Sequence, residues 1–205
     1  MPNWMTSEVQ ITGPSDEIAR FRSAHICSDE DGEDRLDFNS IIPMPPELKA
    51  TESGGYIDVL VWALGGELYA ERNLLRRLGI HPAADTPISR PWLRDAGIAT
   101  REELLLWAEK EHPDQLDAAR RTLEVERATG YRDWYDWQVD NWGCKWGCYA
   151  FMWLSDDKTA FCMDTPWSAP SPVFEKLVEL YPSLTFACHF VEAGNDIDYV
   201  ETYTA

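Results

Sequence analysis

Basic residues are scarce in this chain of 205 residues: 18 Lys and Arg stand against 36 Asp and Glu, for a formal net charge of −18. Because sites for nucleic acids and anionic lipids are electropositive, this charge argues against direct binding to nucleic acid or to a membrane. It is compatible with an ordinary soluble protein, a binder of basic protein surfaces, or a mimic of DNA. No apolar run approaches the roughly 18 residues that a membrane-spanning helix needs.

Ligand patterns for metals and phosphates are also lacking. Cys144 and Cys148, two of five cysteines, stand four residues apart, but no second ligand pair follows at the spacing of a zinc site. The four suitably spaced cysteines of an iron–sulfur cluster are missing as well. The pairs Gly54-Gly55 and Gly65-Gly66 lack the Lys-Ser/Thr ending of a phosphate loop. The sequence therefore predicts no metal and no other cofactor.

Signals for secretion and for catalysis are missing in the same way. The first residues, Met1 to Met5, lack the basic and apolar regions of a signal peptide, so we expect a cytoplasmic protein with reduced thiols. The four histidines are scattered, and neither a Cys–His nor a Ser–His–Asp constellation can be assigned. No catalytic residue is predicted, and a binding protein is favoured over an enzyme.

Tryptophan, in contrast, is abundant. Four of the ten tryptophans lie within thirteen residues: Trp134, Trp137, Trp142 and Trp146. Each indole brings a large apolar area and one N–H that needs a partner when buried, so such a cluster either builds a core or forms a binding surface. Core packing is the simpler interpretation. As a binding surface, these four residues and Trp167 are the candidate aromatic anchors for a partner.

Carboxylates are concentrated in a loop that follows the first expected helix. Among seven residues, five are acidic: Asp29, Glu30, Asp31, Glu33 and Asp34. The loop could mimic a run of phosphates or hold a cation such as Ca²⁺, but it lacks the ligand spacing of an EF-hand. A solvated loop is the simpler alternative. If the chain binds a basic partner, these five carboxylates are candidate contact residues.

Three further carboxylates, Asp136, Asp140 and Asp164, stand beside tryptophans and near Lys145 in the sequence. A carboxylate beside an indole can have a raised pKa that suits acid–base chemistry, so these four residues are candidate functional polar groups. The alternative is structural: the carboxylates accept hydrogen bonds from indole and backbone N–H groups.

The order of elements predicts an α+β fold with an antiparallel sheet and helices on one face, of the split βαβ kind. Helical spacing covers residues 15–22, residues 56 to about 127 with breaks, and residues 173–180, and Thr100 to Glu103 has the spacing of a capping box. Alternating or apolar runs predict strands over residues 8–12, 36–43, 149–154, 159–164, 184–191 and 197–203.

The two ends of the chain are predicted to form one domain. Residues 1–55 and 131–205 supply its two halves, and residues 56–130 form a helical insert between them. Acidity follows this division, since residues 1–64 and residues 131–205 each hold twelve acids and four bases, a net charge of −8. Residues 65–130 hold twelve acids and ten bases, a net charge of −2. The negative field therefore belongs to the expected sheet domain.

Four segments carry a family resemblance: residues 1–4 with 9–13, residues 36–39 with 42–45, residues 134–146, and residues 164–168 with Pro170 and Pro172. In this order and spacing they resemble the YubB-like family of phage and plasmid accessory proteins. The resemblance covers both ends of the chain and implies a ferredoxin-like domain, interrupted here by the helical insert. Met5 stands where the family often has Cys, and Cys144 where Thr is commoner. The family lends no established activity.

The leading hypothesis is an acidic accessory protein of a mobile element that acts by protein binding. It would inhibit a host defence or nucleic-acid-handling complex, in the manner of an anti-CRISPR protein, by blocking an Arg/Lys-lined groove. One alternative is a single-stranded nucleic-acid binder that uses the tryptophan-rich segment, although the two ends hold eight bases against twenty-four acids. Another is an enzyme centred on Asp136, Asp140, Lys145 and Asp164.

Overall fold

The protein divides into two compact units in a computed structural model that describes residues 3–28, 32–51, 55–66, 93 and 95–205. One unit, which we call the sheet unit, consists of Met1–Met44 and Tyr135–Ala205; the other, the helical unit, is Pro45–Trp134. The insert predicted at residues 56–130 lies inside the helical unit. Residues 67–92, which include part of the predicted helical region, lie outside the described residues.

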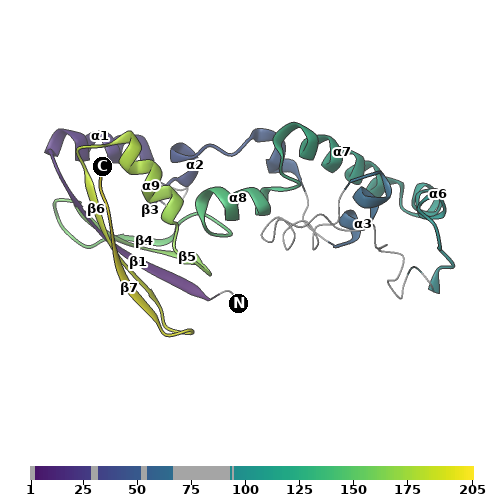
Figure 1. The fold of residues 1–205 in the computed structure, drawn as a ribbon. Coiled ribbons are helices and arrows are strands. Elements are labelled where there is room, and N and C mark those ends of the chain that lie inside the picture. The colour runs from purple at the N-terminus through teal and green to yellow at the C-terminus, as the bar shows by residue number, and fades with distance from the viewer. Residues whose placement is uncertain (1–2, 29–31, 52–54, 67–92, 94) are drawn as a thin grey trace. The chain divides into compact units, whose positions relative to one another are not determined.

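Five antiparallel strands form the sheet unit, in the order β4-β5-β1-β6-β7 (Figure 1). Along the chain, β1, α1, β4, β5, α9 and β6 follow the βαββαβ order of a ferredoxin-like fold, and β7 adds an edge strand. The predicted α+β fold with an antiparallel sheet is confirmed. The elements are β1 (Trp4–Thr12), α1 (Ser15–His25), β4 (Tyr149–Trp153), β5 (Ala160–Pro166), α9 (Ser171–Leu180), β6 (Thr185–Glu192) and β7 (Ile197–Tyr203).

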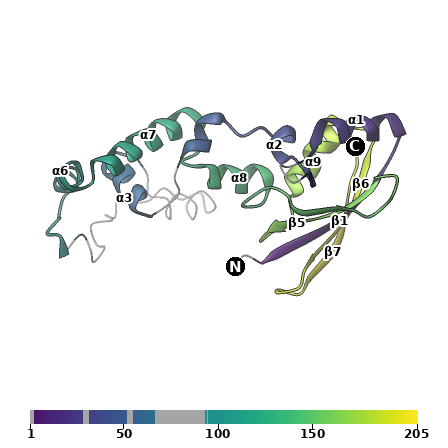
Figure 2. The same ribbon diagram turned by 180° about the vertical axis from the view of Figure 1, so that it is seen from behind.

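Helices cover one face of this sheet, and α1 and α9 lie on the same side of it in both views (Figures 1 and 2). Apolar side chains at alternate positions of β1, such as Val9 and Ile11, point to this side and are buried. They share a core with Phe21 of α1, Phe174 of α9 and Phe186 of β6. Successive strand residues point to opposite faces, so the intervening side chains lie on a face that we call the open face.

The strand predicted over residues 36–43 is wrong. Asp34–Leu36 form a short strand, β3, which pairs with β2 (Ile26–Ser28) in a separate two-stranded sheet. Phe38–Ile41 then form a short helix, α2. The Asp37 carboxylate caps this helix by accepting a hydrogen bond from the Asn39 backbone N–H at 3.0 Å, and this local bond competes with extended structure.

The helical unit packs α3 (Gly55–Ala63) against α6 (Arg101–Glu111) and α7 (Pro113–Thr129), after a 3₁₀ helix at Pro46–Ala50. Leu60, Leu104 and Leu116 lie in its apolar core. The predicted capping box is confirmed, because the Thr100 hydroxyl accepts a hydrogen bond from the Glu103 N–H at 3.1 Å and the Glu103 carboxylate accepts one from the Thr100 N–H at 3.1 Å.

A buried arginine joins two helices of this unit. Arg132 is 2% exposed, and its guanidinium donates to Asp58 of α3 at 2.6 Å and to Glu126 of α7 at 3.2 Å. A buried charge is tolerated when ion pairs and hydrogen bonds satisfy it, and removing one partner leaves the others unpaired. The position of α3 against α7 therefore depends on this arginine.

We expect Arg132→Met to destabilise the helical unit by about 3 kcal/mol, because two carboxylates lose their buried cation. Amide hydrogen exchange in α3 and α7 measures the loss. The matched control is Arg120→Met, which removes an exposed ion pair with Asp117 at 2.8 Å and costs about 1 kcal/mol or less. Equal protection in the two variants would contradict the structural role of Arg132.

Candidate binding surface

The tryptophan-rich segment divides between the core and the surface. Trp137 and Trp142, both on α8 (Trp134–Trp142), are 5% and 6% exposed. Their rings meet edge to face with 5.6 Å between centroids, and Trp142 Nε1 donates to the Ile42 carbonyl at 3.0 Å. The expectation that these two indoles contact a partner is wrong, because both are buried inside the sheet unit.

Trp134 belongs to the helical unit. Its backbone N–H donates to the Thr51 hydroxyl at 3.1 Å, and its side chain is half-buried. A role for Trp134 in partner binding stays a prediction.

The acidic loop is described only at its C-terminal end. Asp34 opens β3, where its carboxylate accepts hydrogen bonds from Trp153 Nε1 at 2.9 Å and Ser28 Oγ at 3.0 Å and pairs with Lys158 at 3.4 Å. The indole hydrogen bond first, and then the Ser28 bond, hold the pKa of Asp34 below its usual range. Asp34 thus fastens β3 to β4, which is a structural role. Three members of the predicted set lie outside the described residues: Asp29, Glu30 and Asp31.

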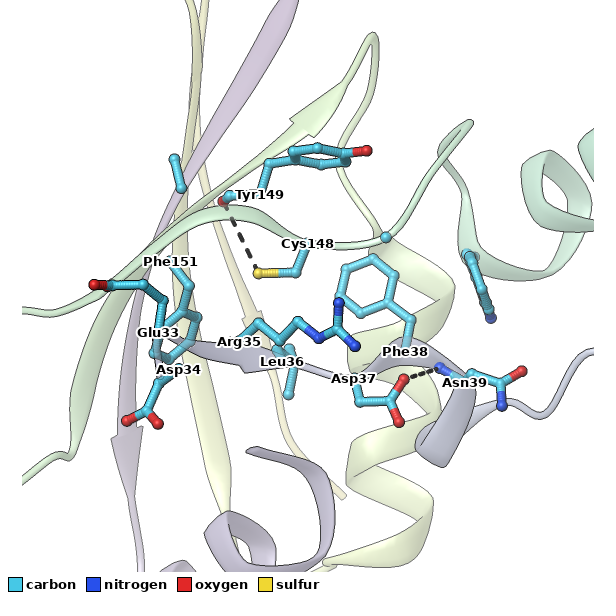
Figure 3. Close-up of a pocket in the computed structure, with 13 residues that line it drawn as sticks. Glu33, Asp34, Arg35, Leu36, Asp37, Phe38, Asn39, Cys148, Tyr149 and Phe151 are labelled. Atoms are coloured by element: carbon cyan, nitrogen blue, oxygen red, sulfur yellow. Dashed lines mark hydrogen bonds between the residues drawn. The ribbon is translucent and has the colours of Figure 1, made fainter. Parts of the chain in front are cut away.

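The remaining loop carboxylate, Glu33, borders a hollow of about 540 Å³ between β3 and residues 147–151 (Figure 3). Arg35 and Cys148 lie in this hollow (Figure 3). Burial raises the pKa of the Cys148 thiol to about 12, so the sulfur is protonated and weakly nucleophilic at neutral pH. The thiol of Cys144 is affected in the same way, with a pKa of about 12. Neither cysteine has the thiolate character of a reactive site.

Trp146 and Trp167 come together around Lys145. The Lys145 ammonium lies 4.3 Å from the ring centroid of Trp146, 4.9 Å from that of Trp167 and 5.7 Å from that of Tyr135. An ammonium over aromatic faces is attracted by their π electrons, so the cation holds three rings in one cluster. Trp167 stays 47% exposed and presents its indole at the surface.

A close approach of two chain segments fixes this cluster. Gly143 has φ of +80°, and its carbonyl accepts a hydrogen bond from Ser168 Oγ at 2.5 Å. A Cβ at this position would lie 2.8 Å from Pro172 Cδ and 3.0 Å from the Ala169 carbonyl oxygen. Glycine is therefore required both by the backbone and by the contact, which sets the loop of Lys145 against that of Trp167.

The aromatic cluster continues onto the open face of the sheet. Trp146 lies 6.3 Å from Tyr149 between ring centroids, and Tyr149 lies 5.3 Å from Trp4. We call Tyr135, Lys145, Trp146, Trp167, Tyr149 and Trp4 the aromatic ridge. The sequence prediction missed Trp4 and Tyr149, although the alternation along residues 4–12 places Trp4 on one face with Glu8.

The open face is acidic and partly apolar. Strand register places Glu8 of β1, Asp164 of β5 and Asp198 of β7 on it. Five large apolar side chains there are between 38% and 70% exposed: Trp4, Tyr149, Met152, Leu154 and Val200. None of the described residues that the five strands place on the open face is Lys or Arg. Such a face combines charge of one sign with apolar contact area.

The basic residues of the sheet unit lie elsewhere. This unit holds twenty acids and six bases, a net charge of −14. Arg20, Lys158 and Lys176 pair with carboxylates, and Arg22 lies over the Trp153 ring. Lys145 is held in the aromatic ridge, and Arg35 Nε donates to Cys27 Sγ at 3.3 Å. Among the described residues, no Lys or Arg of this unit forms an ion pair with Glu8, Asp164 or Asp198.

His189 is the one basic side chain among the described residues that the five strands place on the open face. Its Nε2 lies 2.7 Å from Asp198 Oδ1, and its Nδ1 lies 3.9 Å from Glu8 Oε2. The hydrogen bond to Asp198, followed by the charges of Asp198 and Glu8, raises the pKa of His189. Below that pKa the imidazolium partly offsets the two carboxylates.

The four candidate polar residues lie on different elements of the sheet unit. Asp164 accepts a hydrogen bond from Thr6 Oγ1 at 2.7 Å on the open face, whereas Asp136 and Asp140 lie on α8. Within the described part of the chain, no ion pair joins Asp164 to Lys145. No cluster of three or more His, Cys, Asp or Glu among the described residues could hold a metal. An enzyme centred on the four residues stays a prediction.

Comparisons with known proteins add one structural likeness. By sequence, the chain matches no family model and no curated protein. In structure it is similar to the crystal structure of a protein api92 from Yersinia pseudotuberculosis, of the family DUF1281, at 12% identity and a TM-score of 0.45. That match covers 100% of this chain and 95% of the other. None of the described helices is long and apolar enough to cross a membrane.

We expect Trp142→Ala to cost about 3 kcal/mol or more, because it leaves a cavity in the core and orphans the Ile42 carbonyl. We expect Trp167→Ala, at the exposed end of the ridge, to cost about 1 kcal/mol, the size of one lost cation–π contact. Urea denaturation followed by far-UV circular dichroism measures both values. The opposite ranking would contradict the division of the tryptophans into core and surface.

Proposed function

We propose that this chain is an accessory protein of a mobile genetic element that acts by binding a protein with a basic surface. The observation that carries the proposal is the open face, where Glu8, Asp164 and Asp198 stand among exposed apolar side chains with no Lys or Arg among the described outward-facing residues. The resemblance of both chain ends to the YubB-like family of phage and plasmid proteins supports the biological setting. In this proposal the protein acts in the cytoplasm.

The partner would be a host defence or nucleic-acid-handling complex with an Arg/Lys-lined groove. A net charge of −14 on the sheet unit steers such a partner by long-range attraction. Exposed aromatic and apolar residues then supply contact area, since aromatic anchors carry much of the binding energy at protein interfaces. By occupying the groove, the protein would exclude nucleic acid, as an anti-CRISPR inhibitor does.

A second candidate is binding of single-stranded nucleic acid by the aromatic ridge. The observation in its favour is the exposure of Trp4, Tyr149 and Trp167 along the aromatic ridge, because bases stack on aromatic rings. The neighbouring carboxylates oppose it, since they repel phosphates. Filter binding of a single-stranded oligonucleotide at low salt separates the candidates, because even weak binding to nucleic acid is detectable there.

Affinity capture from host lysate after nuclease treatment, at low and at high salt, tests the proposed function. We expect a partner with a basic surface that survives nuclease and is weakened by salt. We expect the triple variant Glu8→Gln, Asp164→Asn, Asp198→Asn to lose about tenfold in affinity for that partner, because three charges leave the open face.

The matched control is Glu109→Gln, Glu124→Gln, Glu175→Gln, which changes the net charge equally at exposed helical positions. Its affinity should stay close to that of the wild type. An equal loss in both triple variants would assign the effect to net charge alone and remove the open face from the mechanism. Capture of nucleic acid without protein, or of nothing, would overturn the proposed function.

A further inference from the structure

The open face contains a hollow of about 280 Å³. Small residues on the two strands that flank β1, Ala160 of β5 and Ala187 of β6, leave room there, while Leu154 and Val200 stand on its border. These two border residues are 49% and 70% exposed. The hollow therefore offers apolar contact to a side chain that enters it from a partner.

One carboxylate also borders the hollow. Glu8 lies beside it on β1, with a side chain that is 58% exposed, and its cross-strand neighbours are Cys162 and His189. Gln10, the other polar residue of β1 at the hollow, donates to the Thr159 carbonyl at 3.2 Å. The hollow thus presents small and apolar side chains, together with Gln10 and His189, beside a single carboxylate.

We propose that this hollow receives one Lys or Arg side chain of the protein partner. The aliphatic stem of such a side chain packs against Ala187 and Val200, and its charged head pairs with Glu8. Long cationic side chains combine these two properties, since their methylene groups bury against apolar surface while the charge stays near water. The inference rests on the proposed function and names the contact through which a basic partner is held.

Other occupants fit the hollow less well. A second copy of this chain would bring its own Glu8, Asp164 and Asp198 against the same residues, and juxtaposed like charges are destabilising. A purely apolar side chain would desolvate Glu8 without supplying a counter-charge. A phosphate group would meet carboxylates and no Lys or Arg on the described part of the face.

His189 competes with the incoming cation. The charged groups that face it are Glu8 on β1 and Asp198 on β7, the two strands that flank β6. When protonated, His189 partly neutralises both carboxylates and repels a second cation. Its pKa is raised, so the imidazolium forms as the pH falls through that value. The affinity for a basic side chain should therefore rise with pH through the same range and then level off.

An NMR titration of the full-length ¹⁵N-labelled chain tests the inference. The probes are two blocked nine-residue peptides of Ala and Leu, one with a central Arg and one with citrulline, its uncharged analogue, at that position. We expect the Arg peptide to shift the amides of β1, β6 and β7 around Glu8, Ala187 and Val200. We expect the citrulline peptide to bind about fivefold more weakly, the effect of one exposed charge pair.

Two variants probe the contact. Ala187→Leu fills the hollow without changing charge, and Glu8→Gln removes the charge without changing shape. We expect Ala187→Leu to abolish the mapped shifts and Glu8→Gln to weaken the Arg peptide about fivefold. The matched controls are Ala19→Leu and Glu175→Gln, at exposed positions of α1 and α9, and both should bind as the wild type does.

His189→Gln gives the pH readout. The wild-type affinity for the Arg peptide should fall several-fold between about pH 8 and about pH 5.5, and the variant should lose that dependence. Shifts that map to the helices, equal binding of the citrulline peptide, or full binding by Ala187→Leu would overturn the inference.

The capture experiment keeps the two proposals apart. A basic partner that is bound by the wild type and equally by Ala187→Leu overturns the hollow as its contact, while the proposed function stands. If no basic partner is captured, the proposed function fails, and the peptide titration alone decides whether the hollow binds a cationic side chain.

Discussion

The central position of β1 is the constraint on which the sheet unit depends. β1 is hydrogen-bonded to β5 on one side and to β6 on the other, and both partners lie far along the chain. Side chains alternate along a strand, so this double pairing fixes which face every residue of β1 takes. A shift by one residue would turn Val9 and Ile11 to solvent and Glu8 into the core. The acidic open face and the apolar core are therefore two results of one register.

The same register keeps the acidic residues of the open face apart. Glu8 stands opposite Cys162 and His189, Asp164 opposite Thr6 and Tyr149, and Asp198 opposite Val191. Because like charges directly opposite one another destabilise a sheet, this spacing allows a face with three carboxylates to remain folded. Apolar residues such as Val191 and Tyr149 occupy some of the positions opposite them, so acidic and apolar groups are interspersed on the surface that we assign to a partner.

The sequence predicted the five long strands and the helices α1 and α9 of the sheet unit, with clear alternation in residues 184–191, but it did not predict α8 or β2. It failed at residues 36–43, where the Asp37 carboxylate accepts a capping hydrogen bond from the Asn39 N–H and favours a short helix. Burial of individual tryptophans was not predictable, because Trp142 and Trp146 are both followed by Gly-Cys and differ in what packs against them. The residues of the open face were predictable only in part. Alternation along the strand places Trp4 and Glu8 on the same face, but which face the helices cover depends on the tertiary fold.

The division of the sheet unit between the two ends of the chain has a consequence for biosynthesis. A ribosome releases the whole helical unit, residues 45–134, before the first residue of β4 appears. The apolar residues of β1 and α1 must then wait, without their partner strands, until residue 192 at the end of β6 has been made. Domains generally fold as units during synthesis, so the inner unit completes its core first and the nascent N-terminal segment stays exposed to chaperones in the meantime.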